Sequence, residues 1–328
     1  MKKFTLIGFL IISLLLTITF SGFAAESITL RVAAGGLEGQ WYATSVALAE
    51  IVNKTDPTIK IDVVPGAGLS NPARVGAGEI EMSMSFPPFT NTAFNGTPPF
   101  DSAFPDIRGG IKGFGPSLLQ FIVNADTGLE TLDDLINQKF PINLVVERKG
   151  TTDEYSLTKI LEFYGIDYST IEKWGGSVKF VGYGDQVILV KDKHANGVFQ
   201  NIAAPSPTII EMATSRDIKI LKLSDELVKY MNEKYSYSIG VIPKGSYGGT
   251  IPQEDLKSPA SIASWIINKN VPEDVVYRIT KIICENADLV RKIHPSTASF
   301  DPTQAGLDLG ALLHPGAERY YKEAGYIK

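Results

Sequence analysis

The sequence has few of the residues that build disulfides and metal sites. Its 328 residues contain one cysteine, Cys284, and three widely spaced histidines, His194, His294 and His314. A single cysteine cannot form an intramolecular disulfide, and three scattered histidines without an HExxH motif cannot supply a His/Cys metal cluster. We therefore expect no structural disulfide and no bound metal.

Signatures of catalysis are missing as well. The chain has no GxSxG nucleophile elbow and no GK[ST] phosphate loop. Its carboxylate pairs, Asp133-Asp134, Asp153-Glu154 and Glu273-Asp274, each lie near the first turn of an expected helix. Carboxylates in that position complement the helix dipole, so the pairs favour a structural role. The sequence predicts that the protein is not an enzyme.

The chain also lacks an excess of positive charge. It carries 31 Lys and Arg against 36 Asp and Glu, for a net charge of −5. A mildly acidic surface argues against binding to nucleic acid or to anionic lipid. The partners that remain are small solutes and other proteins.

The one long hydrophobic run lies at the start of the chain. Met1-Lys2-Lys3 precedes the apolar stretch FTLIGFLIISLLLTITF and then the small residues of SGFAA. This order is typical of a secretory signal, with cleavage after Ala24 or Ala25, and we favour Ala24 because a cut after Ala25 would place bulky Phe23 at the third position before it. An uncleaved anchor is the alternative, although the run is shorter than the ~18 residues of a membrane span. We expect a signal peptide at 1–24 and export to a periplasm.

Short apolar runs alternate with helical patterns through the rest of the chain, which predicts an α/β protein. About 300 residues without a disulfide are enough for two lobes that rely on their own cores. We expect two lobes, each a sheet flanked by helices, with a ligand between them at the carboxyl ends of the strands. The predicted domains are 25–125 with 240–328, and 126–239.

Three glycine-containing loops each follow an expected strand and begin an expected helix. They cover 35–41, 66–71 and 150–152. Backbone N–H groups at such a helix start can bind an anion, and nearby hydroxyls and amides add further donors. The alternative is that these side chains only cap their helices, because Ser, Thr and Asn are common there. The side chains concerned are Ser70, Asn71, Thr151 and Thr152.

The first loop does not match a dinucleotide-binding fingerprint. Its glycines follow the pattern GGxxG, and Ala34 occupies the place of the first fingerprint glycine. The next expected strand, IKIDVV, has its acid Asp62 in the middle and not at the end where a ribose partner belongs. We expect no nucleotide and no other cofactor.

Aromatic residues near these loops have two interpretations. Trp41 and Phe199 could form walls of a pocket or pack in the core. Tyr42 falls on the predicted buried stripe of the first helix with Val46, Ala49 and Val52, so we expect it in the core with its hydroxyl at the cleft. Residues 86–106 lack periodicity and predict either a lid-like loop or an irregular surface segment.

Several longer segments resemble the TAXI proteins, the extracytoplasmic receptors of one branch of the TRAP transporters. They include GGLEGQWYATSVALAEI, VPGAGLSNPARVGAGEIEMSMS, INLVVERKGTTDEYSLTKILEFYG and HANGVFQNIAAPSPTIIEMA. The C-terminal LLHPGAERYYKEAGYI fits as well, so the similarity covers nearly the whole mature chain. Trp41 and Thr152 depart from the residues most common in the family, so the resemblance does not fix the ligand.

The resemblance implies a type II periplasmic binding protein, or Venus flytrap, that delivers a small carboxylate to an ion-gradient-driven TRAP permease. The ligand would be an amino acid or a dicarboxylate-like solute. Matching the family's motifs to this sequence also implies which residues line the cleft, with Ser85 as a further contact. These residues are Gly36, Tyr42, Ser70, Asn71, Gly150, Thr151, Thr152, Phe199, Gln200, Asn201 and Pro205.

Two cationic side chains, Lys149 and Arg108, are candidates to assist the backbone amides in binding the carboxylate. Two alternatives to a transport receptor stay open. One is a periplasmic ligand sensor that partners a membrane signalling protein, because fold alone does not separate sensing from transport. The other is a periplasmic enzyme on a similar scaffold, against which the missing base–nucleophile pair argues.

Overall fold

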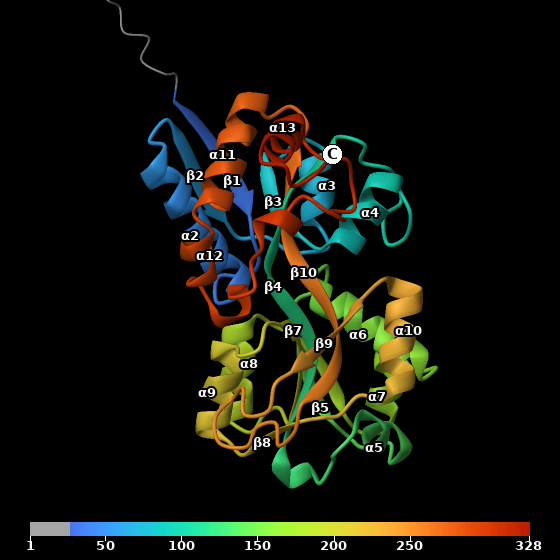
Figure 1. Cartoon of the computed structure of the whole chain (residues 1–328). Coiled ribbons are helices and arrows are strands. Elements are labelled where there is room, and N and C mark those ends of the chain that lie inside the picture. The colour runs from blue at the N-terminus through green and yellow to red at the C-terminus, as the bar shows by residue number, and fades with distance from the viewer. Residues whose placement is uncertain (1–26) are drawn as a thin grey trace, which may run out of the picture.

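The fold consists of two groups of helices joined by two long strands (Figure 1). A computed structural model describes residues 27–328, and the predicted signal peptide lies outside them. Ten strands form one continuous sheet in the order β2-β1-β3-β10-β4-β7-β5-β6, with β8 paired to β4 and β9 paired to β10. Within residues 27–328, no helix is long and apolar enough to cross a membrane.

The first lobe contains both ends of the described chain. Its strands β1, β2 and β3 are parallel to one another, as expected where helices connect them. The strands are β1 (Ile28–Ala33), β2 (Ile59–Val64) and β3 (Met82–Ser85), and the helices are α2 (Gln40–Thr55), α3 (Asn71–Gly76), α4 (Pro87–Asn95), α11 (Glu273–Glu285), α12 (Ala287–Arg291) and α13 (Pro315–Glu323).

The second lobe repeats this plan with the middle of the chain. Its strands β5, β6 and β7 are parallel, and β7 pairs antiparallel to β4. The strands are β5 (Asn143–Val146), β6 (Ser177–Phe180), β7 (Gly197–Ile202), β8 (Ile218–Ile220) and β9 (Ser238–Ile242), and the helices are α5 (Leu132–Asn137), α6 (Thr152–Phe163), α7 (Tyr168–Lys173), α8 (Tyr183–Lys191), α9 (Pro207–Ser215) and α10 (Asp225–Tyr235).

Strands β4 (Ile107–Asn124) and β10 (Leu256–Asn268) run through both lobes. They pair antiparallel to each other, and their register shifts between Ile262 and Ser264 and again between Trp265 and Ile266. A register shift locally bends and twists a strand pair. The pair therefore connects the lobes through irregular positions near its middle.

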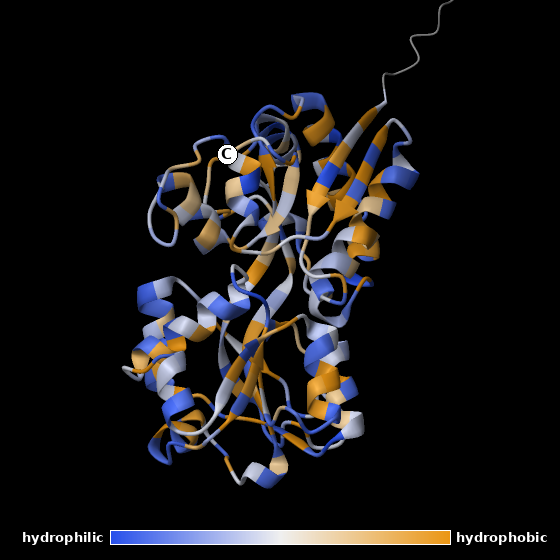
Figure 2. Ribbon diagram, turned by 180° about the vertical axis from the view of Figure 1, so that it is seen from behind, coloured by the Kyte–Doolittle hydropathy of each residue, from blue (hydrophilic) through white to orange (hydrophobic). Residues whose placement is uncertain are grey.

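The strands are rich in hydrophobic residues, and the helices carry polar residues interspersed with hydrophobic ones (Figure 2). Every residue of β3 and of β7 is buried. Parallel strands covered by helices on both faces are expected to be buried in this way. Polar loops follow these buried strands at their carboxyl ends.

The buried face of the first helix includes Ala49 and Val52, as predicted, but not Val46. Ser45, Leu48, Ala49 and Val52 form the buried stripe of α2, whereas Val46 is 36% exposed. Ser45, Leu48, Ala49 and Val52 have the spacing i, i+3, i+4 and i+7, so the small residue Ser45 begins the stripe. The predicted place of Val46 was wrong because the prediction followed side-chain hydrophobicity rather than packing against the sheet.

The segment 86–106 is more regular than predicted. Its first half is α4, which has prolines in its first turn and ends at Gly96 with φ 68°. Proline is favoured at the first helical position, and glycine readily takes the left-handed conformation that ends a helix. The prediction of a loop was wrong here, because Pro87-Pro88 starts a helix instead of breaking one.

Candidate functional site

A cavity of about 390 Å³ lies between the two lobes. The first lobe contributes the loops after β1 and β2, and the second lobe contributes the start of α6, the start of α8 and the end of β7, with Ser117 of β4 between them. The lining consists of Gly35, Gly36, Leu37, Glu38, Gly39, Gln40, Trp41, Pro65, Gly66, Ala67, Gly68, Ser117, Glu147, Arg148, Lys149, Thr151, Thr152, Asp153, Tyr183, Asn201 and Ile202.

The wall from the first lobe is mostly backbone. Gly39 is the N-cap residue of α2 and makes no side-chain cap, while its carbonyl accepts the Tyr42 N–H at 3.1 Å. The first amides of a helix have no intrahelical partner, so those of Gln40 and Trp41 are available at the cavity. Such amides and the positive end of the helix dipole favour an anion.

Two glycines of this wall allow the lobes to touch. A Cβ added to Gly39 would lie 3.2 Å from Cε2 of Tyr183, and one added to Gly68 would lie 2.8 Å from Cγ2 of Thr152. Tyr183 and Thr152 both belong to the second lobe. Any larger residue at Gly68 would push the lobes apart, so close approach depends on the missing side chain.

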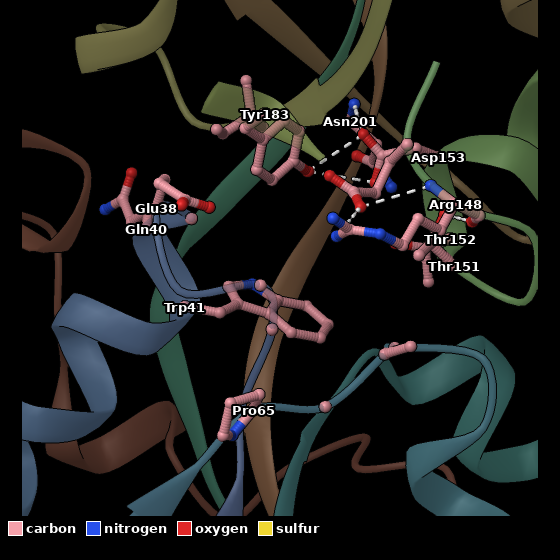
Figure 3. Close-up of a pocket in the computed structure, with 18 of the residues that line it drawn as sticks. Glu38, Gln40, Trp41, Pro65, Arg148, Thr151, Thr152, Asp153, Tyr183 and Asn201 are labelled. Atoms are coloured by element: carbon pink, nitrogen blue, oxygen red, sulfur yellow. Dashed lines mark hydrogen bonds and ion pairs between the residues drawn. The ribbon is translucent and has the colours of Figure 1, made fainter. Parts of the chain in front are cut away.

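Trp41 forms an aromatic part of the same wall. Its ring meets Phe86 edge-on, with centroids 4.6 Å apart and planes at 63°. Its atoms also lie next to Gly35 and Gly68, where added Cβ atoms would be 3.4 Å and 3.0 Å away. Trp41 is half-buried, and Figure 3 shows it between the Pro65 loop and the polar cluster of the second lobe.

The second lobe begins its wall at the start of α6. Thr151 is the N-cap, and its hydroxyl accepts the Glu154 N–H at 3.3 Å and donates to the Arg148 carbonyl at 2.7 Å. The Glu154 carboxylate accepts the Tyr168 hydroxyl at 3.1 Å. Thr151 therefore holds the turn, and both Thr151 and Thr152 border the cavity.

Asp153 is a buried acid and not the exposed first-turn acid that the sequence predicts. It is 3% exposed, accepts the Tyr183 hydroxyl at 3.0 Å and accepts the Asn201 N–H at 2.7 Å (Figure 3). Burial raises the pKa of Asp153 to about 7, and the charge of Glu147 adds to the rise, against the opposing effect of the hydrogen bonds. Asp153 was expected to complement the dipole of α6 from an accessible first turn. Packing against β7 and α8 buries it instead.

Glu147 is a second buried acid, at 5% exposure. Its Oε1 accepts from the backbone N–H and from Nη1 of Arg148, each at 3.2 Å. Its Oε2 is buried and has no hydrogen-bond partner among residues 27–328. Burial raises the pKa of Glu147, and the neighbouring charge of Glu38 raises it further, while Arg148 and the backbone N–H of Tyr183 oppose the rise.

Asn201 lies at the carboxyl end of β7 and faces the same cavity. It is 5% exposed, and neither Oδ1 nor Nδ2 has a partner in the described part of the chain. Gln40 is similar, because its Nε2 donates to Ser296 Oγ at 2.8 Å while its Oε1 has no described partner. Buried polar atoms are normally paired, so these atoms point to a ligand or bound water.

Six of the residues predicted from the sequence line this cavity. The first lobe supplies Gly36 and Trp41, and the second supplies Lys149, Thr151, Thr152 and Asn201. The Lys149 ammonium lies over the Phe180 ring, 4.9 Å from its centre, and makes a cation–π interaction with it.

Three predicted residues of the first lobe serve the loops behind the cavity. Asn71 is fully buried; its Oδ1 accepts the Ala67 N–H at 3.1 Å and its Nδ2 donates to the carbonyl of Ala34 at 2.8 Å. Asn71 therefore holds the loop to the sheet, and helix α3 starts at this residue instead of being capped by it. The Ser70 hydroxyl donates to the Ala67 carbonyl at 3.1 Å, and the Tyr42 hydroxyl donates to Val63 at 3.4 Å.

The other predicted residues also lie outside the cavity lining. Phe199 is fully buried, because it precedes Asn201 by two positions on the same strand and lies deeper in the core. Gln200 points to the opposite face, where its Nε2 donates to Gln186 at 2.9 Å. Arg108 donates to the Pro105 and Ile107 carbonyls, each at 2.7 Å. Ser85, Gly150 and Pro205 are likewise absent from the lining.

The sequence reasoning missed the most distinctive polar residues of the site, namely Glu147, Asp153 and Tyr183. Glu147 directly follows the carboxyl end of β5, which was a usable signal, whereas Asp153 lies in the first turn of α6, just after the predicted 150–152 loop. Tyr183, the first residue of α8, carried no comparable local signal in the sequence. Burial decides the roles of all three, and burial depends on contacts between distant segments.

Solved structures share this fold at low sequence identity. MatC from Rhodopseudomonas palustris with bound malate matches with a TM-score of 0.54 and 12% identity, covering 93% of this chain and 98% of that one. A structure described as a periplasmic transporter matches at 0.53 and 13%, covering 92% and 94%. A protein from Bordetella bronchiseptica RB50 matches at 0.51 and 13%, covering 90% and 98%.

These similarities confirm the predicted two-lobed α/β fold of periplasmic binding proteins. Identities of 12% and 13% support the fold and leave the ligand open. The sequence profile of the NMT1-like family matches residues 32–325, which is nearly all of the described chain. The protein therefore belongs to the NMT1-like family.

Proposed function

We propose that the protein is an extracytoplasmic solute-binding receptor of the TAXI type. It would capture a small carboxylate between its lobes and deliver it to an ion-gradient-driven TRAP permease. The observation that carries this proposal is the interlobe cavity, in which buried polar atoms of Asn201, Gln40 and Glu147 have no hydrogen-bond partner among the described residues. Convergent unpaired polar atoms in a cavity are typical of a binding site.

Two helix starts support carboxylate binding. Helices α2 and α6 begin at the cavity from opposite lobes, with Gln40, Trp41 and Thr152 in its lining. Their first amides and positive dipole ends favour an anion held between the lobes. The Arg148 guanidinium, whose side chain is 63% exposed, is a further candidate donor.

A ligand held in this way would favour the closed arrangement of the lobes. We propose that residues 25–125 with 240–328 move as one lobe and residues 126–239 as the other. The contacts of Gly39 with Tyr183 and of Gly68 with Thr152 would form and break as the lobes move. Strands β4 and β10 would bend near the register shift at Ile262, and the ligand would select the closed state.

A thermal-shift screen of small acids against neutral solutes tests the binding function. A ligand at 100 times its Kd should stabilise the folded protein by about 2.7 kcal/mol, which raises Tm by several degrees. A neutral solute that raises Tm while every acid fails would contradict the carboxylate class. Uptake of the identified ligand by the reconstituted permease, driven by a sodium gradient without ATP, would test the transport partner.

A further inference from the structure

A second cavity, of about 740 Å³, lies between the lobes and shares no lining residue with the first. It is bounded by α4 of the first lobe, by α6 and α10 of the second, and by residues 260–262 of β10. Figure 1 shows these three helices together to the right of β4 and β10. Cavities of about 300–1,000 Å³ are typical of sites that bind small organic molecules.

A row of aromatic rings separates the two cavities. Trp41, in the lining of the first cavity, meets Phe86 with centroids 4.6 Å apart, and Phe86 lies 6.4 Å from Phe89. Phe89 lines the second cavity and meets Tyr155 of the other lobe edge-on at 5.2 Å. Because Phe86 and Phe89 are both buried, this row is a closed partition and the two cavities are distinct sites.

A lysine without a compensating partner lines the second cavity. Lys112 of β4 is half-buried, and its ammonium makes no ion pair and no hydrogen bond within the described part of the chain. Burial lowers the pKa of Lys112, and the charge of Asp308 opposes this effect. A half-buried ammonium that has lost part of its hydration and has no bonded partner favours an anion beside it.

The other charged groups of the lining leave it positive. Lys159 and Lys234 both bind the Glu162 carboxylate, at 3.0 Å and 2.7 Å. The lining therefore holds three lysines against two acids, Glu162 and Asp308, in a protein whose net charge is −5. The excess positive charge is that of one lysine, which suits a solute with a single negative group.

The rest of the lining is largely apolar. Ile262 is 40% exposed, and Pro87, Pro88 and Pro99 lie around the same cavity. Water leaves such apolar surface readily when a solute covers it. Ser261, next to Ile262, is 4% exposed, and its Oγ has no hydrogen-bond partner among residues 27–328. An unpartnered buried hydroxyl in a cavity lining is a donor for a bound group.

We propose that the second cavity binds a bulky organic anion, whose charged group lies at Lys112 and Ser261 and whose apolar body lies against Ile262 and the prolines. The anion satisfies the lysine that the protein leaves unpaired, and the apolar body covers the exposed side chains of the wall. This site is additional to the first cavity, so it does not depend on which solute the first cavity binds.

Three probes separate the charge from the apolar body. Naphthalene-1-sulfonate has both, naphthalene-1-sulfonamide has the same body without the charge, and inorganic sulfate has the charge without the body. Calorimetry on the unmodified protein measures Kd for each probe. We expect naphthalene-1-sulfonate to bind at least tenfold more tightly than either of the others.

Three lysine variants then locate the bound probe. Lys112→Met removes the charge of the second cavity, and Lys149→Met removes the same charge from the lining of the first. Lys179→Met is the neutral control, because Lys179 is exposed on β6 and lines neither cavity. Lys112→Met should weaken binding of naphthalene-1-sulfonate about 10- to 100-fold, the range for a hydrogen bond to a charged group, and the other two should leave its Kd unchanged.

Lys112→Met is expected to fold, because the Lys112 ammonium has no partner to lose, and its Tm checks this. The proposal is overturned if naphthalene-1-sulfonate does not bind, or if the sulfonamide or sulfate binds as tightly. It is also overturned if folded Lys112→Met keeps the original Kd, or if Lys149→Met abolishes binding, which would place the probe in the first cavity. The three probes on the unmodified protein give a result even if Lys112→Met folds poorly.

Discussion

The two walls of the interlobe cavity differ in the groups that they present to a ligand. The first-lobe wall presents mainly glycine backbone, from Gly35, Gly36, Gly39, Gly66 and Gly68, together with Trp41. The second-lobe wall presents buried side chains, chiefly Glu147, Asp153 and Asn201. Backbone amides can bind any anion, whereas a buried carboxylate and amide discriminate between solutes.

This difference assigns a separate task to each lobe. The first lobe needs small residues so that it can approach the second lobe closely, as the contacts of Gly39 and Gly68 show. The second lobe needs groups fixed by hydrogen bonds, as Tyr183 and Asn201 fix Asp153. We therefore expect substitutions in the first wall to affect closure and substitutions in the second to affect chemistry and stability.

The largest expected effect comes from Asp153→Asn and appears in the pH dependence of stability. The folded-state pKa of Asp153 is about 7, above its ordinary value of 3.8. The unfolded chain therefore releases the proton first, and stability is lost as pH rises from 3.8 to about 7, on the order of 4 kcal/mol. The amide of Asp153→Asn should remove this loss, measured by urea unfolding at pH 4 to 8.

Asp192→Asn provides the matched control, because Asp192 is exposed and the substitution removes the same charge. Its profile should follow that of the unmodified protein. An Asp153→Asn profile that falls with pH as steeply as the original would show that Asp153 does not titrate in this range. Glu147, Tyr183 and Asn201 face Asp153, so Glu147 is the next group to test.

A smaller effect is expected from Gly68→Val in the first wall. A Cβ at this position would lie 2.8 Å from Thr152 Cγ2 and 3.0 Å from Trp41 Cζ3, so closure becomes crowded. Overpacking of this kind costs about 1–3 kcal/mol, which should weaken ligand binding roughly 5- to 150-fold. Calorimetry measures Kd for the identified ligand.

Gly36→Ala is the control within the same wall, because a Cβ there meets nothing within 4 Å. It should leave closure of the lobes uncrowded and therefore weaken binding less than Gly68→Val does. If both variants weaken binding equally, the loop acts through its backbone flexibility and not through the close approach of the lobes.

The smallest effects separate two neighbouring hydroxyls in the second wall. Thr151→Val removes the cap of α6 and should lower the free energy of unfolding by about 1 kcal/mol. Thr152→Val leaves the cap intact and should weaken carboxylate binding by about 1 kcal/mol, close to fivefold. Urea unfolding and calorimetry on both variants test the division, and an unchanged Kd in Thr152→Val would remove its hydroxyl from the site.

The positions of the loops could be predicted because glycine and hydroxyl residues between a strand and a helix are a local signal. Gly36, Thr151 and Thr152 were found in this way, and all three line the cavity. The same signal failed at Asn71, whose side chain holds the loop to β1. A local pattern shows that a polar side chain forms a specific hydrogen bond, but not whether its partner is a ligand or the backbone.

The acids of the second wall could not be predicted, because their environment is assembled from distant segments. Asp153 is buried by Tyr183 and Asn201, which lie 30 and 48 residues further along the chain. Without those contacts, an acid in a first helical turn looks like an ordinary partner of the helix dipole. Val46 illustrates the same limit in the fold, because packing against the sheet chose which face of α2 is buried.

The position of β10 in the sheet has a consequence for the order in which the chain folds. This strand lies between β3 and β4, although more than a hundred residues separate it from either in sequence. Until residue 268 has been synthesised, the early strands β1, β2 and β3 have no neighbour to join them to β4. Contacts that span so much chain form slowly. The first lobe therefore completes its sheet only after nearly the whole polypeptide exists, and a chain that ends before β10 leaves β3 without the strand that joins it to β4.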